Sequence, residues 1–372
     1  MYILYAIFIE LQRWLRLYQE LGMINETIVL VAKELGLGIQ RAARDPDIST
    51  PDTARGSAPV PILSRLFEAV AEAAHDNVPI VKQAVGPRAA LELVRLLQRE
   101  CESVVKTTLY DFKEHHHLAD QQQKLMSGGT GIDPRDLDLL LGEIATICQR
   151  GARYDSFIRE LAGNVYTSIP SEDAKNLPAG GLERETVLNR EMAELLSFAA
   201  GAEKHYLDAS ILKATRIDSY NDSDISGVST IVDDTFFIVG KSVRRGVASH
   251  SVTNACAVLN YSASAIETIF LSHEERKLAE FAMKAFPVPS GAASIGGICK
   301  PQLCITLNNL DAAADGINKL CTEVEAASSK MFAHQHDLVE YSLNQLRSLT
   351  DRCVQMCQVC AEDCTHCLLI AE

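Results

Sequence analysis

Five cysteines near the carboxyl end of the chain have the types and spacing that come closest to a metal site. They follow the pattern C-x3-C-x2-C-x3-C-x2-C, with His366 beside the last of them: Cys353, Cys357, Cys360, Cys364 and Cys367. Thiolates at these spacings lie on one helical face and could hold zinc or an iron–sulfur cluster. The same residues continue an apolar pattern that begins well before them, and buried cysteine packs as a small hydrophobic side chain. The pattern favours core packing, with a metal site and an exposed chain end as the alternatives.

A pair of aspartates in the middle of the chain raises the possibility of catalysis. Asp233 and Asp234, followed by Thr-Phe-Phe, are similar to the Asp-rich motif with which all-α prenyl-converting enzymes hold magnesium and diphosphate. The acidic residue needed one turn later is missing, because Phe236 and Phe237 stand there. No G-x-x-x-x-G-K-[ST], G-x-S-x-G or H-E-x-x-H motif occurs in the sequence. We therefore predict no enzymatic function, no catalytic or cofactor-binding residue and no cofactor; a prenyl-type enzyme is the alternative from another class.

Two further polar stretches could hold a metal ion, and both are better explained without one. Adjacent side chains on a helix point about 100° apart, so His115, His116 and His117 cannot close a tetrahedral site together. We interpret them as a solvated helix end. Asp222 and Asp224 lack the alternate ligands, central Gly and terminal Glu of a calcium loop. We predict no metal site.

Composition limits the function classes further. The chain has 372 residues, a net charge of −14 and 6% aromatic residues. The sequence has no cluster of Lys and Arg that could neutralise the phosphates of a nucleic acid, which argues against nucleic-acid binding. It also has no basic run that could dock on an anionic membrane, which argues against direct electrostatic membrane binding. The apolar start, MYILYAIFIE, is far shorter than the ~20 residues that span a bilayer and lacks the features of a signal peptide. We therefore expect no transmembrane segment, a cytosolic location and 11 reduced cysteines.

The elements that must position these residues are helices. The central stretch 228–260 carries an apolar stripe at spacings of three and four: Val232, Phe236, Val239, Val243 and Val247. Such spacing predicts a helix with one buried face. The charged residues fall largely off the stripe and predict a face for solvent or another chain: Asp233, Asp234, Lys241, Arg244 and Arg245.

Breaks in the pattern predict two domains. Residues 44–61 are rich in Pro, Asp, Ser and Thr, which indicates a linker. Residues 167–182 have a similar composition and indicate a domain boundary. We predict a first helical bundle over residues 1–170 and a second over 183–372, with a flexible connection at 287–301. Within the first, a helix at about 62–85 contains Pro79, and another begins at Pro134 after the N-cap residue Asp133.

The last helices have a seven-residue repeat. One row is Leu310, Ile317, Val324 and Met331, and its companion row is Ala314, Cys321 and Ser328. A second register runs through Val339, Leu346, Cys353, Cys360 and Cys367, paired with Leu343, Thr350, Cys357 and Cys364, so the five terminal cysteines lie in the predicted contact itself. This spacing predicts a coiled-coil-like contact between two long helices.

Several blocks of sequence resemble one family in collinear order. The string STIVDDTFFIVGKSVRRGVAS, followed by AVLN, resembles the middle of the subunit 4 family of the conserved oligomeric Golgi complex. The other matching blocks are WLRLYQELGM, LSRLFEAVAEAAHDNVPIVKQAVGP with LVRLLQRECESVV, DPRDLDLLLGEIATICQR and CITLNNLDAAADGINKL. The family's amino-terminal coiled-coil region and carboxyl-terminal domain have no counterpart, which predicts an internal piece.

The resemblance implies an all-α fold of elongated, stacked helical bundles. It also implies a non-catalytic subunit of a vesicle-tethering complex on the cytosolic face of Golgi membranes, acting in intra-Golgi retrograde transport and SNARE-dependent docking. The implied partners are other subunits of the complex, SNARE proteins and their regulators. A subunit of another helical-rod tether, such as an exocyst-like one, is the alternative within the same class.

Overall fold

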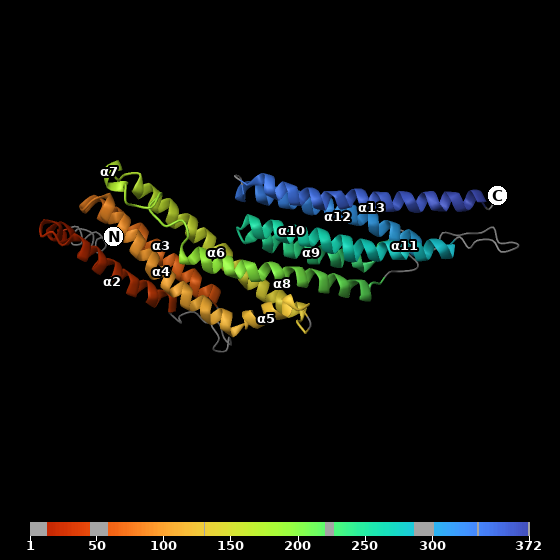
Figure 1. Ribbon diagram of the computed structural model, residues 1–372, viewed down its shortest axis with the longest axis horizontal. Coiled ribbons are helices and arrows are strands. Elements are labelled where there is room, and N and C mark those ends of the chain that lie inside the picture. Colours follow the sequence, from red (N-terminus) through yellow and green to blue (C-terminus); the bar gives the residue numbers. More distant parts are fainter. Residues whose placement is uncertain are drawn as a thin grey trace. The chain divides into compact units, whose positions relative to one another are not determined.

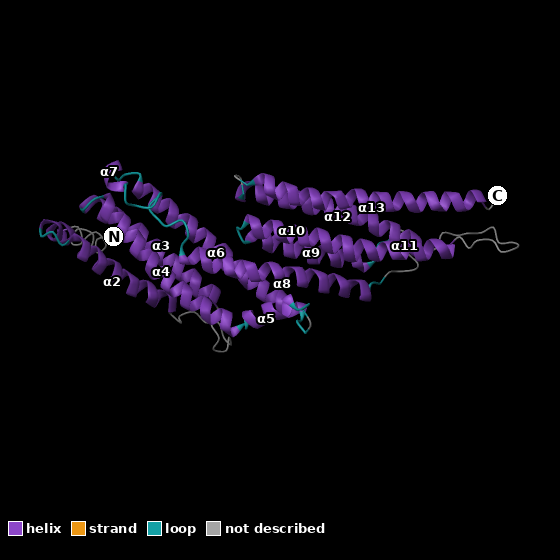
Figure 2. Cartoon of the chain, viewed as in Figure 1, coloured by secondary structure: helices purple, strands orange, loops and turns teal. Residues whose placement is uncertain are grey.

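The computed structural model describes residues 13–44, 59–129, 131–219, 227–285, 301–332 and 335–370. Every regular element in these ranges is a helix, which confirms the predicted all-α class (Figure 2). Four predicted features fall partly or wholly outside the described ranges: the apolar start at 1–12, the linker at 45–58, the stretch 220–226 with Asp222 and Asp224, and the connection at 286–300.

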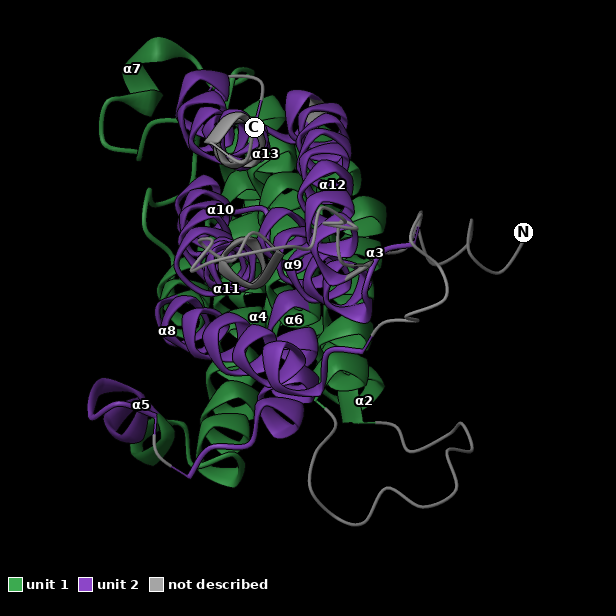
Figure 3. Ribbon diagram, turned by 90° about the vertical axis from the view of Figure 1, so that its right-hand side faces the viewer, with its two compact units in different colours: residues 1–121, 146–196 green, residues 122–145, 197–372 purple. Residues whose placement is uncertain are grey.

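Contacts divide the chain into two compact units (Figure 3). Unit 1 comprises residues 1–121 and 146–196, and unit 2 comprises residues 122–145 and 197–372. Two long helices, α6 (Pro134–Tyr166) and α8 (Val187–Ile217), each contribute a part to both units. The division into domains at 1–170 and 183–372 stays a prediction.

Unit 1 is built on three helices that contact one another: α2 (Ile24–Arg44), α3 (Pro59–Ala84) and α4 (Pro87–His115). α3 starts slightly earlier than predicted and contains Pro79. Gly86, with φ of +124°, separates α3 from Pro87 at the start of α4, which matches the preference for Gly after a helix and Pro at its first position. A short helix, α7 (Ser171–Ala174), follows α6.

Unit 2 contains the helices that follow α8 and residues 122–126 of α5; Figure 1 labels these helices along the chain. They are α5 (Leu118–Met126), α9 (Thr230–Ala248), α10 (Val252–Ala265), the π-helical turn η1 (Ile266–Leu271), α11 (Ser272–Ala285), α12 (Pro301–Met331) and α13 (His336–Ile370). The predicted start of α6 is confirmed, because Asp133 Oδ1 accepts a hydrogen bond of 2.9 Å from the backbone N–H of Arg135.

The apolar stripe of α9 forms part of the core of unit 2. Val232, Val239, Val243 and Val247 are all buried, and Phe236 packs against them partly exposed. Gly246 allows α10 to lie close to α9, because a Cβ there would lie 3.0 Å from Val258 Cβ on α10. The predicted helix and its buried face are therefore confirmed.

The seven-residue repeats form the contact between α12 and α13. Leu310, Ile317, Val324 and the companion residues Ala314, Cys321 and Ser328 are buried on α12. Val339, Leu343, Leu346, Cys353 and Cys360 are buried on α13. Both registers therefore pack as predicted over the described side chains.

Among the described residues, one stretch is long and apolar enough to cross a membrane by length and composition. It covers Val252–Glu280, in which α10, η1 and α11 follow one another. Its residues Val258, Leu259, Ile266 and Phe270 are fully buried in the core of unit 2. Packing in a protein core explains this apolar character without a membrane.

Candidate functional site

The charged side of α9 is only in part the solvent face that the sequence predicts, because Asp233 and Arg244 are exposed and Arg245 is buried. Arg245 is 9% exposed, and its guanidinium binds Glu203 on α8 through two parallel hydrogen bonds of 2.6 and 2.8 Å. A third hydrogen bond of 2.7 Å joins Arg245 to Asp138 on α6, which also accepts one of 2.5 Å from Lys241. We call Asp138, Glu203, Tyr206, Lys241 and Arg245 the Arg245 network. The prediction was wrong for Arg245, because the buried Glu203 on another helix pairs with it; Lys241 pairs with Asp138 but stays 40% exposed.

Ionic interactions stabilise the charged forms in the Arg245 network. Burial alone would raise the pKa of Asp138, but hydrogen bonds and positive charge from Lys241 and Arg245 hold it below its usual value. Arg245 also lies over the ring of Tyr206, with its Cζ 4.9 Å from the ring centroid. Burial and the nearby Asp138 raise the pKa of Tyr206 to about 12. The arrangement holds three helices together and leaves no free nucleophile or base among these residues.

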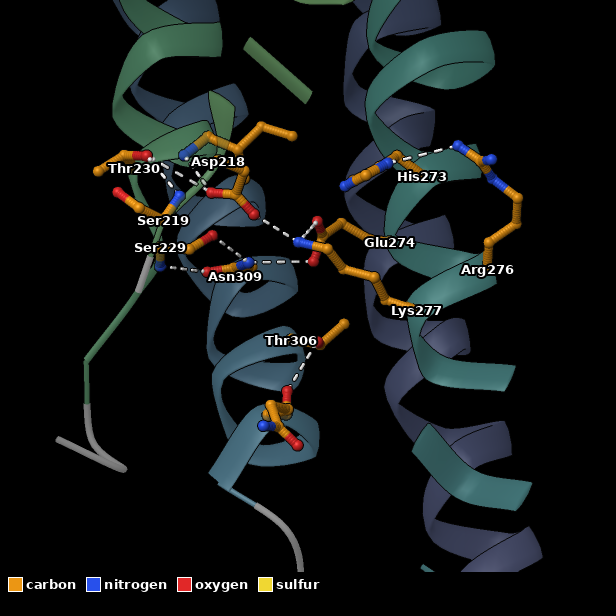
Figure 4. A network of polar contacts seen from close by, with 12 residues as sticks. Asp218, Ser219, Ser229, Thr230, His273, Glu274, Arg276, Lys277, Thr306 and Asn309 are labelled. Atoms are coloured by element: carbon orange, nitrogen blue, oxygen red, sulfur yellow. Dashed lines mark hydrogen bonds and ion pairs between the residues drawn. The ribbon is translucent and has the colours of Figure 1, made fainter. Parts of the chain in front are cut away.

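A second polar cluster joins the end of α8 to the start of α9 and to α11 and α12 (Figure 4). Asp218 Oδ1 accepts a hydrogen bond of 3.1 Å from the backbone N–H of Ile231, so it caps α9 from another helix. Asn309 accepts from Ser229 N at 2.8 Å and donates to Ser229 Oγ at 2.9 Å and to Glu274 Oε2 at 3.0 Å. We call Asp218, Ser229, Glu274, Lys277 and Asn309 the Asp218 network.

The Asp218 network contains the donor set nearest to a metal site, but the ammonium group of Lys277 already pairs with both of its carboxylates. Ligand atoms of Asp218, His273 and Glu274 lie within 4.8 Å of one another. Lys277 Nζ lies between the two carboxylates, 2.5 Å from Asp218 Oδ2 and 3.4 Å from Glu274 Oε1. Burial and the cations Lys277 and Arg276 lower the pKa of His273. A metal ion would have to displace Lys277, so the residues fit a structural ion pair better than a cation site.

Asp233 and Asp234 lie in different surroundings at the start of α9. Asp233 is exposed, and Asp234 borders a surface pocket of about 260 Å³ between the starts of α6 and α9 and the end of α8. The pocket also contains Asp138, which is already paired with Lys241 and Arg245. Neither residue of the pair belongs to a group of three possible metal ligands among the described residues.

The terminal cysteines follow the core packing that the sequence favours, as far as the structure describes them. Cys353 and Cys360 are buried, and Cys357 is half-buried. Burial raises the pKa of Cys353 to about 11, so this thiol stays neutral at physiological pH. The side chains of Cys364 and Cys367 lie outside the described residues.

The three histidines lie where α4 ends, as predicted. The helix ends at His115, and the backbone of His117 adopts a φ of +49°. The ring of His116 lies 4.6 Å from that of Phe112, so it packs on the last turn of the helix.

Sequence reasoning missed the Asp218 network and the acidic partners of Arg245. Asp218 and Asn309 lie far apart in the sequence, and no local pattern links them. Glu203 and Glu274 are charged residues within helices, where an exposed position is the usual expectation. Only the folded arrangement of the helices could reveal these partners.

Comparison with known proteins finds a family model over more than half of the chain. The model of the COG4 transport protein, middle alpha-helical bundle, matches residues 49–278. A solved structure titled "Computational Design of Self-Assembling Cyclic Protein Homooligomers" covers 91% of this chain and 98% of its own, with 9% identity. Its TM-score of 0.26 is too low to support any conclusion.

Curated relatives from animals and a plant share the same name, "Conserved oligomeric Golgi complex subunit 4". The Bos taurus and Homo sapiens proteins are each 26% identical over 305 residues, which cover 73% of this chain and 39% of theirs. The Arabidopsis thaliana protein is 24% identical over 365 residues, which cover 92% of this chain and 48% of its own. The chain thus spans less than half the length of these relatives. The match to the middle helical bundle over residues 49–278 shows that the chain belongs to the COG4 family.

Proposed function

We propose that this chain is a non-catalytic subunit of a multisubunit Golgi tethering complex. The observation that carries the proposal is the family match over residues 49–278, together with relatives that are named as subunits of the conserved oligomeric Golgi complex. The chain acts through surfaces that bind other proteins. In that role it takes part in intra-Golgi retrograde transport and in docking of vesicles that depends on SNARE proteins.

The packing of the helices supports a scaffolding role. The charged residues of the Arg245 and Asp218 networks in unit 2 pair with one another across helices. In these pairs the charged groups bind one another and hold the helices in register. A catalytic site would instead leave a base or nucleophile available for reaction. A rigid scaffold that makes weak contacts at several points raises the effective concentration of a vesicle near its target membrane.

The proposed partners are the other subunits of the complex, SNARE proteins and their regulators. The proposed location is the cytosolic face of Golgi membranes, to which the chain binds peripherally. We also propose that its helical bundles correspond to domains at 1–170 and 183–372, joined by segments that carry no site.

Location is the direct test of this function. We expect a fluorescently tagged chain, expressed at its native level, to colocalise with a Golgi membrane marker and to be released from membranes by alkaline carbonate. Uniform cytosolic fluorescence, or retention after carbonate, would contradict the proposal.

A separate assay tests the enzymatic alternative. Pure protein is incubated with magnesium and an allylic diphosphate, beside the Asp233→Ala variant. We expect no turnover from either protein. Saturable turnover that Asp233→Ala abolishes would instead establish the prenyl-type enzyme.

A further inference from the structure

The surface pocket of unit 2 that Asp234 borders has walls that are largely apolar. It has a volume of about 260 Å³ and lies at the starts of α6 and α9 and the end of α8. Pro134, Ala214, Ile217 and Ile238 contribute the apolar part of its lining. The packing of the three helices leaves this space open, so it is a candidate binding site.

Asp234 is the carboxylate of this pocket that has no partner. Its side chain is half-buried and forms no hydrogen bond or ion pair with any other residue in the part of the chain that the structure describes. Asp138 is paired with Lys241 and Arg245, and Asp133 accepts the hydrogen bond that caps α6. A hydrogen bond between a cation and a carboxylate is stronger than a neutral one, and more so where water is partly excluded. Asp234 is therefore available to bind a positively charged group.

Two cations also line the pocket, but neither pairs with Asp234. Arg135 and Lys213 are exposed, and their side chains form no ion pair with another described residue. Their charges lie at the ends of long, flexible side chains that reach into water. The carboxylate of Asp234 is instead carried by a short side chain on a helix. The charge that is held in place beside the apolar walls is therefore negative, and the net charge of −14 of the whole chain also favours a cation.

Apolar walls and one unpaired carboxylate fit the side chain of arginine or lysine. Such a side chain packs its aliphatic stem against apolar surface and carries its charge at the end. A metal ion would instead need several oxygen ligands, and no group of three possible metal ligands among the described residues includes Asp234.

Exposed apolar side chains around the pocket indicate that the basic side chain belongs to another protein. Ile217 is 62% exposed, and Phe237, which neighbours Ile238 on α9, is 65% exposed. A small free cation would leave both side chains in water, whereas a protein surface that inserts one basic residue would also cover them. Buried arginines surrounded by apolar contacts are common anchors of protein interfaces.

We propose that this pocket receives an arginine or lysine side chain of a partner protein. The charged end of that side chain lies at Asp234, and its stem lies against Ile217 and Ile238. The proposal deepens the proposed function, on which it rests for the existence of a protein partner; the chemistry of the pocket is tested on the pure chain.

Titration of the pure 372-residue chain with N-acetyl-arginine amide, followed by NMR of the isoleucine methyl groups, tests this chemistry. We expect saturable shifts at Ile217 and Ile238 and none at Ile317, which is buried on α12. Asp234→Asn should weaken binding about three-fold to ten-fold, because it removes the charge that holds the guanidinium. The matched control is Asp233→Asn, which removes the same charge from the exposed neighbour and should weaken binding by less than about two-fold.

The α-amide of N-acetyl-glutamate reverses the charge of the probe and should cause no saturable shift. Equal or tighter binding of this probe would mean that Arg135 and Lys213 set the charge of the pocket, which would overturn the proposal. Unchanged methyl signals with the arginine probe, or equal binding by Asp234→Asn, would also overturn it.

Affinity purification of the tagged chain from its own cells tests the partner. We expect Asp234→Lys to lower the recovery of at least one subunit of the Golgi complex by about two-fold or more, because like charges repel across an interface. Asp233→Lys should leave recovery unchanged, and circular dichroism confirms that each variant is folded. Equal recovery of every subunit with Asp234→Lys would overturn the assignment to a partner. Absence of all subunits from the unsubstituted chain would contradict the proposed function and with it the partner, while the NMR titration would still decide the chemistry of the pocket.

Discussion

Replacing Arg245 tests how strongly the buried ion pairs stabilise unit 2. Arg245→Met keeps most of the aliphatic volume of the side chain and removes its five N–H donors. Glu203, which is 3% exposed, then loses both of its hydrogen bonds to the guanidinium, and Asp138 keeps Lys241 and Tyr206 as partners. Removing one partner of a buried ion pair costs about 3–5 kcal/mol, because it leaves the other charge buried without compensation. We expect the free energy of unfolding to fall by that amount.

Chemical unfolding followed by circular dichroism measures this loss of stability. A double-mutant cycle gives the interaction energy between Arg245 and Glu203 apart from their other contacts. Glu203→Leu removes the other partner, and the double variant Arg245→Met with Glu203→Leu leaves no unpaired charge at the pair itself. We expect the double variant to be more stable than Arg245→Met alone, because an apolar replacement of a buried pair is often neutral. Arg244, which is 63% exposed on the same helix, provides the control, and Arg244→Met should change stability by less than about 1 kcal/mol.

The reasoning would be refuted in either of two ways. A loss below about 1 kcal/mol for Arg245→Met would mean that the ion pair contributes no more than a surface pair. Equal and additive losses from the two single variants would mean that Arg245 and Glu203 do not act on each other.

Acid should destabilise the protein in part through Asp138. Its pKa is lowered in the folded state from the ordinary 3.8, so its contribution is present above about pH 3.8 and is lost as the pH falls through the folded value. Arg245→Met removes one of the two cations responsible. We therefore expect the variant to lose less stability than the unsubstituted protein when the pH is lowered below about 4, as measured by urea unfolding at each pH. An identical pH dependence would contradict this assignment.

Four further predictions concern packing and thiol chemistry. Gly246→Ala should destabilise the protein by about 1–3 kcal/mol, because the new Cβ would lie 3.0 Å from Val258 Cβ. Gly201→Ala, at a helical position with nothing within 4 Å, should stabilise it by about 0.5–1 kcal/mol in the same urea assay. Cys353, whose pKa is raised to about 11, should resist iodoacetamide at pH 8 while the half-buried Cys256 reacts, as peptide mass spectrometry would show; equal labelling would contradict its burial. Ile317→Ala should cost about 2–5 kcal/mol in thermal or urea unfolding if the α12–α13 contact is a packed core, and a cost near zero would refute that packing.

Local signals in the sequence were sufficient for the helices and for their buried faces. Asp133 before Pro134 predicts the start of α6 because capping and proline act within one turn. The seven-residue rows that include Ile317 and Leu346 predict the α12–α13 contact because the repeat encodes which face each helix buries.

The polar networks could not be predicted in the same way. Helical periodicity gives the angle of Arg245 around α9, but it does not tell which helix lies opposite. The partner Glu203 is 42 residues away in the sequence, and Lys277 is 59 residues from Asp218. Pairing at such distances depends on how the helices pack, which a single sequence does not encode in any local pattern.

The most direct test of the proposed function is the set of proteins that accompany the native chain. An antibody against residues 228–260, used on extracts of the cells that make this protein, would recover it for mass spectrometry of its companions. The account predicts that the other subunits of the Golgi tethering complex copurify with it in stable proportion. Recovery of the chain without any of those subunits would contradict the proposal that it is a subunit of that complex.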